Sequence, residues 1–215
     1  MHGDKKFIRN IRRDYLKDDL LEKDISSDPV KQFGKWFHEA LESELVDGNA
    51  MTLVTVSGNR PSARIVLLKS FNENGFEFFT NYGSQKARDI EKNPEGCLLF
   101  YWAEFERQIR INGLLEKITR EESAEYFSQR PRDSQIGAHA SRQSEMLASR
   151  QELESRYKTL QEQFEGKDVP CPDFWGGYVL VPDYFEFWQG RPNRLHDRIV
   201  YTLKDGAWLV SRLFP

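Results

Sequence analysis

The chain has 215 residues, with 31 Lys and Arg against 34 Asp and Glu, a formal charge of −3 at pH 7, and 13% aromatic residues. This charge balance argues against a general nucleic-acid binder, which carries a net basic face, and so many aromatic residues exclude a disordered chain. The sequence contains no secretory apolar run, no stretch of about 20 apolar residues and only two distant cysteines, so we expect a soluble cytoplasmic protein without disulfides.

The first 27 residues are highly charged and contain few large apolar groups, so we expect a mobile arm with some helix around residues 8–21. Asp28-Pro29 then has the form of an N-cap followed by proline at the first helical position. Apolar residues recur at helical spacing from there to Gly48, which predicts an amphipathic helix over a core face. The apolar positions are Val30, Phe33, Trp36, Phe37, Ala40, Leu41 and Leu45.

From residue 50 the sequence changes to apolar, β-branched and aromatic runs separated by turn signals such as Asn74-Gly75 and Asp205-Gly206. These runs predict strands over residues 51–57, 62–71, 76–80, 97–103, 108–118, 176–181, 184–189, 196–203 and 207–213. Helices are expected over residues 84–92, from the capping box at Thr119 to residue 129, and over residues 144–164. Antiparallel strands interrupted by helices indicate a mainly β fold, a β-barrel with peripheral helices. No Pro/Gly/Ser linker divides the chain, so we expect one domain over residues 28–215.

Several common sites are missing from the sequence. There is no GxGxxG, no P-loop and no GxSxG stretch, which excludes the usual dinucleotide, nucleotide and hydrolase signatures. No histidine is paired at metal-ligand spacing with Cys or another His, so we expect no metal site. The histidines are His2, His38, His139 and His196.

Three segments set cationic and hydroxyl groups into apolar surroundings. In residues 64–69, strand alternation puts Arg64 and Lys69 on opposite faces, where they could serve two anions. Residues 80–86 run from a strand into a helix N-terminus, whose free N–H groups and dipole favour phosphate. Tyr126 and Arg130 share a helix face and Ser134 follows a proline break, so the three could cradle a phosphate. Snorkelling strand ends, an ordinary capped helix and a charged helix end are the alternatives.

A fourth segment is the most distinctive. Arg194, His196 and Arg198 alternate after an aromatic strand, which would point all three to one side if strand pairing starts there. Three cation-capable groups on one face are costly to bury without anions. Together, the four segments indicate a protein that holds two phosphorylated, planar ligands.

At these segments the sequence closely resembles the pyridoxine/pyridoxamine 5′-phosphate oxidase family, FMN enzymes of vitamin B6 metabolism. The matching stretches are RIVLLK, FFTNYGSQKA, ERQIRINGLLEK, EYFSQRPRDSQIGAHASRQS, FWGGYVLVP and FEFWQGRPNRLHDR, and they follow the family's order from about residue 28 to Pro215. The resemblance implies an FMN-binding split β-barrel of antiparallel strands, assembled as a homodimer with FMN in a cleft between the subunits.

The activity that the resemblance implies is oxidation of pyridoxine 5′-phosphate or pyridoxamine 5′-phosphate to pyridoxal 5′-phosphate. Oxygen is reduced to hydrogen peroxide, and the amine substrate also releases ammonia. Two alternatives stay open: another split-barrel FMN oxidase or reductase, and a non-catalytic carrier of flavin or pyridoxal phosphate. The first would not need the phosphate cradle at Tyr126 together with Arg194 and His196, and the second would lack oxygen-dependent turnover.

The resemblance also implies site residues, position by position. FMN contacts are implied for Arg64, Ile65, Val66, Leu67, Leu68, Lys69, Phe79, Thr80, Gln85, Lys86, Gln108, Gln143, Ser144, Trp188 and Arg198. Substrate contacts are implied for Arg12, Tyr15, Lys69, Tyr126, Arg130, Ser134, Arg194 and His196. Arg194 and His196 would lie over the pyridine ring as the catalytic residues. The family has a basic pair after the serine of the GSQK stretch, and Gln85 stands at the first of these positions, so we expect weaker FMN binding than in a relative with arginine there.

Overall fold

The computed structural model describes Arg9 and residues 14–43 and 45–215. Its strands are β1 (Ala50–Ser57), β2 (Arg60–Leu67), β3 (Ser70–Asn72), β4 (Gly75–Asn81), β5 (Glu95–Trp102), β6 (Arg107–Lys117), β7 (Trp175–Gln189), β8 (Asp197–Lys204) and β9 (Ala207–Arg212). Its helices are α2 (Pro29–Glu42), α3 (Gln85–Lys92), α4 (Arg120–Gln129), α5 (Arg132–Ala140), α6 (Arg150–Gln163) and a 3₁₀ turn, η1 (Pro192–Arg194). The implied substrate residue Arg12 lies outside the described residues.

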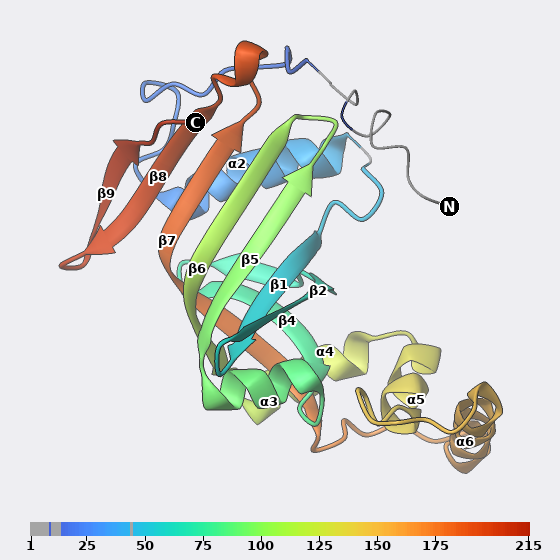
Figure 1. Cartoon of the computed structure of the whole chain (residues 1–215). Helices are drawn as coiled ribbons and strands as arrows, with labels where there is room; N and C mark the ends of the chain where they lie inside the picture. The colour runs from blue at the N-terminus through green and yellow to red at the C-terminus, as the bar shows by residue number, and fades with distance from the viewer. Residues whose placement is uncertain (1–8, 10–13, 44) are drawn as a thin grey trace. The chain divides into compact units, whose positions relative to one another are not determined.

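The strands of the described chain form a nine-stranded sheet in the order β2-β1-β5-β6-β7-β4-β3, with β8 on β7 and β9 on β8 (Figure 1). The predicted mainly β fold of antiparallel strands with peripheral helices is confirmed. The chain forms two compact units. The first unit consists of the described parts of Met1–Gly48, Leu99–Ile111 and Tyr184–Pro215, and the second of Asn49–Leu98 and Asn112–Asp183. The expectation of a single domain over residues 28–215 stays a prediction.

Helix α2 begins where the sequence predicts. The Asp28 carboxylate accepts the backbone N–H of Val30 at 2.9 Å, which satisfies one of the free donors of the first turn. The helix ends at Glu42, earlier than predicted, where the Ser43 hydroxyl donates to the Ala40 carbonyl at 2.8 Å. Such a local bond offers the backbone an alternative to continued helix.

The apolar face of α2 packs on aromatic side chains of the first unit. The buried Phe33 ring lies 5.1 Å from the Phe100 ring of β5, and the Trp36 ring lies 5.3 Å from the Phe187 ring of β7. Full burial of a side chain of Phe size contributes about 1.5–3 kcal/mol. The helix therefore covers a core face, as its periodicity predicts.

The segment before α2 forms no helix over residues 14–21, so the helix predicted around residues 8–21 is wrong over this part. The backbone N–H groups of Leu16 and Lys17 donate to the Glu106 carboxylate at 2.9 and 3.1 Å. An external acceptor thus takes donors that a helix would use internally. The mobility expected for the first 27 residues stays a prediction.

The long strand predicted over residues 62–71 is divided in two. Pairing of β2 with β1 continues as far as residue 67. The N–H of Leu68 then donates to Asn49 at 2.9 Å, whereas the N–H of Lys69 donates to Glu77 in β4, also at 2.9 Å. The backbone changes its pairing partner at this step, which periodicity within one strand cannot reveal.

The polar helix predicted over residues 144–164 begins later, after Ser149. The Ser149 hydroxyl accepts the N–H of Glu152 at 3.2 Å and caps α6. Ser144 has φ 73°, in the left-handed region that a helix does not use. Residues 144–148 therefore form a loop.

Strand β7 joins the two strands predicted over residues 176–181 and 184–189. Its neighbour β6 approaches closely at Gly113, where an added Cβ would lie 2.0 Å from the Val181 carbonyl oxygen. Only glycine allows the two backbones to come this close. Pairing across this point keeps the strand continuous through Pro182, where the sequence indicates a break.

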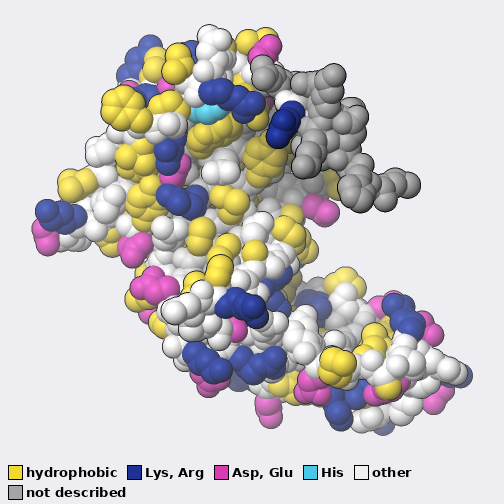
Figure 2. Space-filling view, in the orientation of Figure 1, with side chains coloured by type: hydrophobic (Ala, Val, Ile, Leu, Met, Phe, Trp, Pro, Cys, Tyr) yellow, Lys and Arg dark blue, Asp and Glu magenta, His cyan; other side chains and the backbone are white. Residues whose placement is uncertain are grey.

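The described residues contain no helix that is both long enough and apolar enough to cross a membrane. On the face drawn in Figure 2, the Lys and Arg side chains are mixed with Asp and Glu side chains. The face in view thus carries both charges, as the overall charge balance predicts.

Candidate functional site

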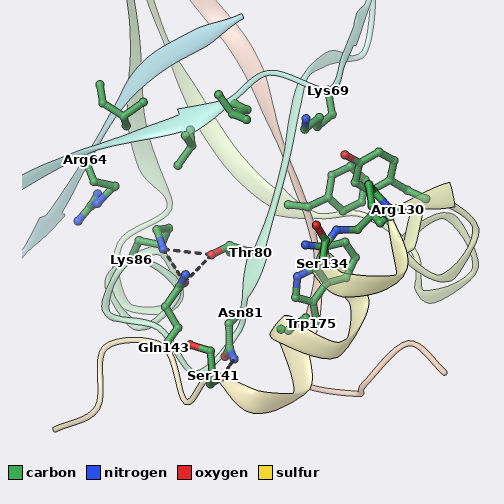
Figure 3. A pocket seen from close by; sticks show the side chains of 18 of the residues that line it. Arg64, Lys69, Thr80, Asn81, Lys86, Arg130, Ser134, Ser141, Gln143 and Trp175 are labelled. Carbon is green, nitrogen blue, oxygen red and sulfur yellow. Dashed lines mark hydrogen bonds between the residues drawn. The ribbon is translucent and has the colours of Figure 1, made fainter. Parts of the chain in front are cut away.

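A cavity of about 850 Å³ lies within the second unit (Figure 3). This volume falls in the range of about 300–1,000 Å³ that is usual for sites of small molecules and cofactors. The implied site residues that line it are Arg64, Ile65, Val66, Leu67, Lys69, Phe79, Thr80, Lys86, Tyr126, Arg130, Ser134 and Gln143. Segments that are far apart in the sequence are therefore brought around one cavity.

One end of the cavity is built on the first turn of α3. The Lys86 ammonium donates to the Gln143 side-chain oxygen at 2.8 Å and to the Thr80 hydroxyl at 3.1 Å (Figure 3). Burial, together with the nearby charge of Arg64, lowers the pKa of Lys86 to about 8. A lysine at a helix N-terminus, beside a second cation, favours an anion such as phosphate.

The Arg64 guanidinium is fixed in the wall beside that end. Its NH1 donates to the Thr55 hydroxyl at 2.7 Å and to the Leu53 carbonyl at 3.3 Å, and its NH2 donates to the Ser62 hydroxyl at 2.7 Å. Burial lowers the pKa of Arg64, but a guanidinium keeps its charge in proteins. This end of the cavity therefore holds a rigid cation next to a titratable one.

The other end of the cavity has an unsatisfied donor. The Arg130 NH1 atom is buried and has no hydrogen-bond partner among the described residues. Leaving a buried donor without a partner costs about 1–3 kcal/mol, so an anionic ligand at this end would satisfy it. Tyr126, Lys69 and Ser134 line the cavity with Arg130, and Figure 3 shows Lys69, Arg130 and Ser134 across from Lys86.

An aromatic wall stands at the Arg130 end. The Phe79 ring stacks on Tyr126 with 4.0 Å between ring centres and on Trp175 with 5.3 Å. The Arg130 guanidinium lies 4.7 Å from the centre of the Trp175 ring. Sequence reasoning missed Trp175, although it is the second residue of the FWGGYVLVP stretch and the first residue of β7. These rings provide flat apolar surface beside the cation, which suits a planar ligand.

Three implied FMN residues of the second unit do not line this cavity. Leu68 is buried in the core, and Gln85 and Ser144 are exposed. For these three the side-chain roles stay predictions.

The remaining implied residues lie in the first unit: Tyr15, Gln108, Trp188, Arg194, His196 and Arg198. Four of them form a cluster. The His196 ring lies 4.6 Å from Trp188 and 5.4 Å from Tyr15, and the Arg194 guanidinium lies 5.9 Å from the centre of the Tyr15 ring. Gln108 is half-buried on β6.

His196 is held in one tautomer. Its Nδ1 atom accepts the backbone N–H of Arg191 at 3.0 Å, so the neutral ring carries its proton on Nε2. Burial, and then the charge of Arg194, lower the pKa of His196 below its usual value. At neutral pH this side chain is therefore a hydrogen-bond donor through Nε2.

Arg194, His196 and Arg198 would share one strand face only if strand pairing started at Arg194, and it does not. Pairing of β8 starts at Asp197, opposite Gln189, so the first two residues precede the strand. Arg194 ends η1 with φ 64°, a left-handed conformation that is uncommon for a residue with a side chain. Such backbone strain clusters at functional sites.

Arg198 is instead part of an ion-pair network on the first unit. Its Nε donates to the buried Glu186 carboxylate at 2.8 Å, and its NH1 donates to the Phe214 carbonyl at 2.8 Å. Arg110 contacts the other carboxylate oxygen of Glu186 at 2.7 Å. Burial alone would raise the pKa of Glu186, but the hydrogen bond from Arg198 and the two arginine charges lower it. The carboxylate therefore stays ionised and holds Arg198 in place.

Among the described residues, no group of three or more His, Cys, Asp or Glu side chains could hold a metal ion. Both cysteines, Cys97 and Cys171, are free thiols.

Two family models match the chain. Residues 37–164 match the model described as pyridoxamine 5′-phosphate oxidase, and residues 175–215 match the one described as the pyridoxine 5′-phosphate oxidase C-terminal dimerisation region. The pyridoxine/pyridoxamine 5′-phosphate oxidase 2 of Hydrogenovibrio crunogenus is 52% identical over 209 residues, which cover 97% of this chain and 98% of that protein. The pyridoxine/pyridoxamine 5′-phosphate oxidase of Rubrobacter xylanophilus is 52% identical over 214 residues, 99% of each chain.

A solved structure is also similar. PhzG from Burkholderia lata, in complex with tetrahydrophenazine-1-carboxylic acid, superimposes with a TM-score of 0.87 at 28% sequence identity. The match covers 93% of this chain and 99% of that one.

Proposed function

The chain belongs to the pyridoxine/pyridoxamine 5′-phosphate oxidase family and is an oxidase of these two phosphates, and we propose that it uses FMN, held by its phosphate at the Arg64 and Lys86 end of the cavity. When bound, FMN supplies the two-electron chemistry that connects the substrate to oxygen. The alcohol substrate loses two electrons and two protons, which convert oxygen to hydrogen peroxide. The amine substrate also consumes a water molecule and releases ammonia.

The single observation that carries this proposal is the pair of cationic ends of one cavity (Figure 3). Arg64 and Lys86 bind the FMN phosphate, and the buried, unpartnered NH1 of Arg130 binds the substrate phosphate together with Lys69. The substrate phosphate provides binding energy remote from the reacting carbon, which orients that carbon for the reaction.

We propose that the chain works as a homodimer with FMN in the cleft between the subunits. The family model over residues 175–215, which contain β7 to β9, is described as a dimerisation region. Ile65 and Leu67 on the cavity wall are 64% and 40% exposed. Apolar side chains exposed beside a ligand cavity fit a surface that a second subunit covers.

The catalytic residues are in the first unit, in the cluster of Tyr15, Trp188, Arg194 and His196. Arg194 orients and polarises the substrate, and the neutral His196 donates a hydrogen bond from Nε2 beside it. A cytoplasmic location stays a prediction.

Two alternatives make different demands on the cavity. PhzG was solved in complex with tetrahydrophenazine-1-carboxylic acid. The cavity of this chain has a second cationic end, at Arg130, which suits a phosphate. A carrier would bind flavin or pyridoxal phosphate without turnover. The Arg130 end favours a phosphorylated substrate over the first alternative.

Aerobic turnover tests the proposed function. Protein reconstituted with FMN is given pyridoxine 5′-phosphate in air, and aldehyde and hydrogen peroxide are followed together. We expect equal amounts of the two products, and a much slower reaction with unphosphorylated pyridoxine. Flavin binding without either product would support a carrier, and equal rates for the two substrates would contradict a phosphate site at Arg130.

The pH dependence of FMN binding follows from Lys86. Its pKa in the apoprotein is about 8, so above that pH the neutral amine has to take up a proton when the phosphate binds. We expect the FMN dissociation constant to rise with pH above about 8, by up to about tenfold per pH unit. Quenching of FMN fluorescence between pH 7 and pH 10 measures this. Lys86→Arg, which stays charged, is the control, and a wild-type profile as flat as that of the control would contradict the role.

Gln85→Arg introduces a cation at the position where the resemblance implies a basic residue. The side chain is exposed, so solvent screens its charge, and we expect FMN affinity to rise only roughly 1.5- to 5-fold. Titration of apoprotein with FMN measures the change. Gln151→Arg adds the same charge at an exposed position of α6 and serves as the control. Unchanged or weaker affinity in Gln85→Arg would refute the expectation.

Arg130→Ala should raise KM for pyridoxine 5′-phosphate about 10- to 150-fold while FMN stays bound, because it removes charge-assisted contacts to the substrate phosphate. Lys69→Ala should raise KM in the same direction. Steady-state kinetics on flavin-saturated protein measure both, with Arg150→Ala on the exposed face of α6 as the control. A normal KM in Arg130→Ala would show that the substrate phosphate binds elsewhere.

A further inference from the structure

The buried carboxylate of Asp89 lies beside Arg64 but does not line the cavity. We infer that Asp89 is a positioning residue, which fixes the Arg64 guanidinium for the FMN phosphate through the hydroxyl of Thr55. This inference rests on the proposed function, because it concerns the same phosphate end.

The two residues are buried at the contact between α3 and β1. Asp89 is 4% exposed and Thr55 is fully buried. The Thr55 hydroxyl donates to the Asp89 carboxylate at 3.0 Å, and the same carboxylate oxygen lies 3.7 Å from NH2 of Arg64. A buried charge is stable only when it is paired and hydrogen-bonded, and Arg64 and Thr55 provide both.

The direction of these hydrogen bonds makes Thr55 a relay. A hydroxyl has one proton, and the Asp89 carboxylate can only accept it. The Thr55 oxygen is then left to accept from NH1 of Arg64, which lies 2.7 Å away. Asp89 therefore sets the orientation of the hydroxyl, and the hydroxyl sets the position of the guanidinium.

A fixed arginine is an advantage for anion binding. A free arginine side chain has many rotamers, and ordering them when the ligand binds reduces affinity. The cost of the arrangement is electrostatic, because a carboxylate near the phosphate end repels the phosphate. Positioning and charge repulsion thus predict opposite effects when Asp89 is removed, and affinity measurements can separate them.

Equilibrium binding of two flavins to the full-length apoprotein tests the inference. FMN and riboflavin have the same ring system, but only FMN has the phosphate, so the ratio of their affinities isolates the phosphate end from general damage to the fold. In Asp89→Ala, and likewise in Thr55→Val, we expect FMN affinity to fall about tenfold while riboflavin affinity stays constant. Asp89→Asn keeps an acceptor for the hydroxyl and removes the repulsive charge, so it should bind FMN at least as tightly as the wild type.

A matched control comes from the same helix. Glu91→Gln removes one negative charge from an exposed position of α3 and should leave the ratio of FMN to riboflavin affinity unchanged. Unchanged or tighter FMN binding in Asp89→Ala would overturn the inference, as would equal losses for both flavins. An Asp89→Asn variant as weak as Asp89→Ala would overturn the Thr55 relay. If the wild type does not prefer FMN to riboflavin, the proposed phosphate end itself fails; if it does and the variants keep that preference, only the role of Asp89 fails.

Discussion

Replacing Arg194 by alanine is expected to lower kcat about 10²- to 10³-fold in a protein that keeps its FMN, because it removes a donor aimed at the reacting substrate. The residue is held with φ 64°, and its guanidinium lies over the ring of Tyr15, in the cluster with His196 and Trp188. A strained backbone that aims a cation at a ring cluster is typical of a functional site.

The measurement combines steady-state kinetics with flavin absorbance of the same samples. Arg60→Ala removes an exposed arginine of β2 and should leave both quantities unchanged. Arg194→Lys keeps the charge but not the planar fork, so its turnover should lie between those of alanine and wild type. A yellow Arg194→Ala protein with near-normal kcat/KM would show that this residue takes no part in the reaction. A colourless Arg194→Ala protein would show that Arg194 binds the cofactor.

Arg64→Ala combined with Lys86→Ala is expected to give a colourless protein that no longer takes up FMN at concentrations that saturate the wild type. Each charge-assisted contact to a phosphate contributes about 1.5–3 kcal/mol, so loss of both should weaken FMN binding more than about 100-fold. The single variants should each weaken it by at least about tenfold.

Titration of the apoproteins with FMN measures the loss, and titration with riboflavin is the control, because the two cations act on the phosphate alone. Arg88→Ala, an exposed neighbour of Lys86 on α3, should retain flavin. A double variant that still binds FMN at wild-type concentrations would show that the FMN phosphate binds elsewhere.

Local patterns in the sequence predicted the starts of α2 and α4, but not the start of α6, which begins later than expected. Asp28 and Thr119 cap α2 and α4 as expected, and the capping box of α4 forms in full. These features depend on contacts within four residues of the chain, so the sequence carries them directly.

Features that depend on distant pairing were not predictable from periodicity. The change of partner at Leu68 and Lys69, and the continuous β7, depend on strands far away in the chain. The alternation of Arg194 and Arg198 suggested a common strand face, but alternation applies only inside a paired strand, and η1 intervenes.

The candidate site was likewise predictable only in part from the sequence. Segment chemistry alone pointed to two anions, and the structure brings both cationic ends to one cavity. Flavin as the ligand and the identity of the substrate came from the resemblance, because cations and hydroxyls alone do not specify a ring. The wall residue Trp175 lies in a stretch that carries the resemblance, but its place beside Phe79 depends on distant pairing. The buried pair Thr55 and Asp89 had no sequence signal of its own, since its two residues are far apart in the chain.

A crystal structure of this protein with FMN and pyridoxal 5′-phosphate would test the two-anion cavity most directly. The account predicts the FMN phosphate against Arg64 and Lys86, and the other phosphate against Arg130 and Lys69. It also predicts that Arg194, of the same or the partner subunit, lies over the pyridine ring. Phosphate groups bound away from these side chains, or an Arg194 remote from the ring in every subunit, would contradict it.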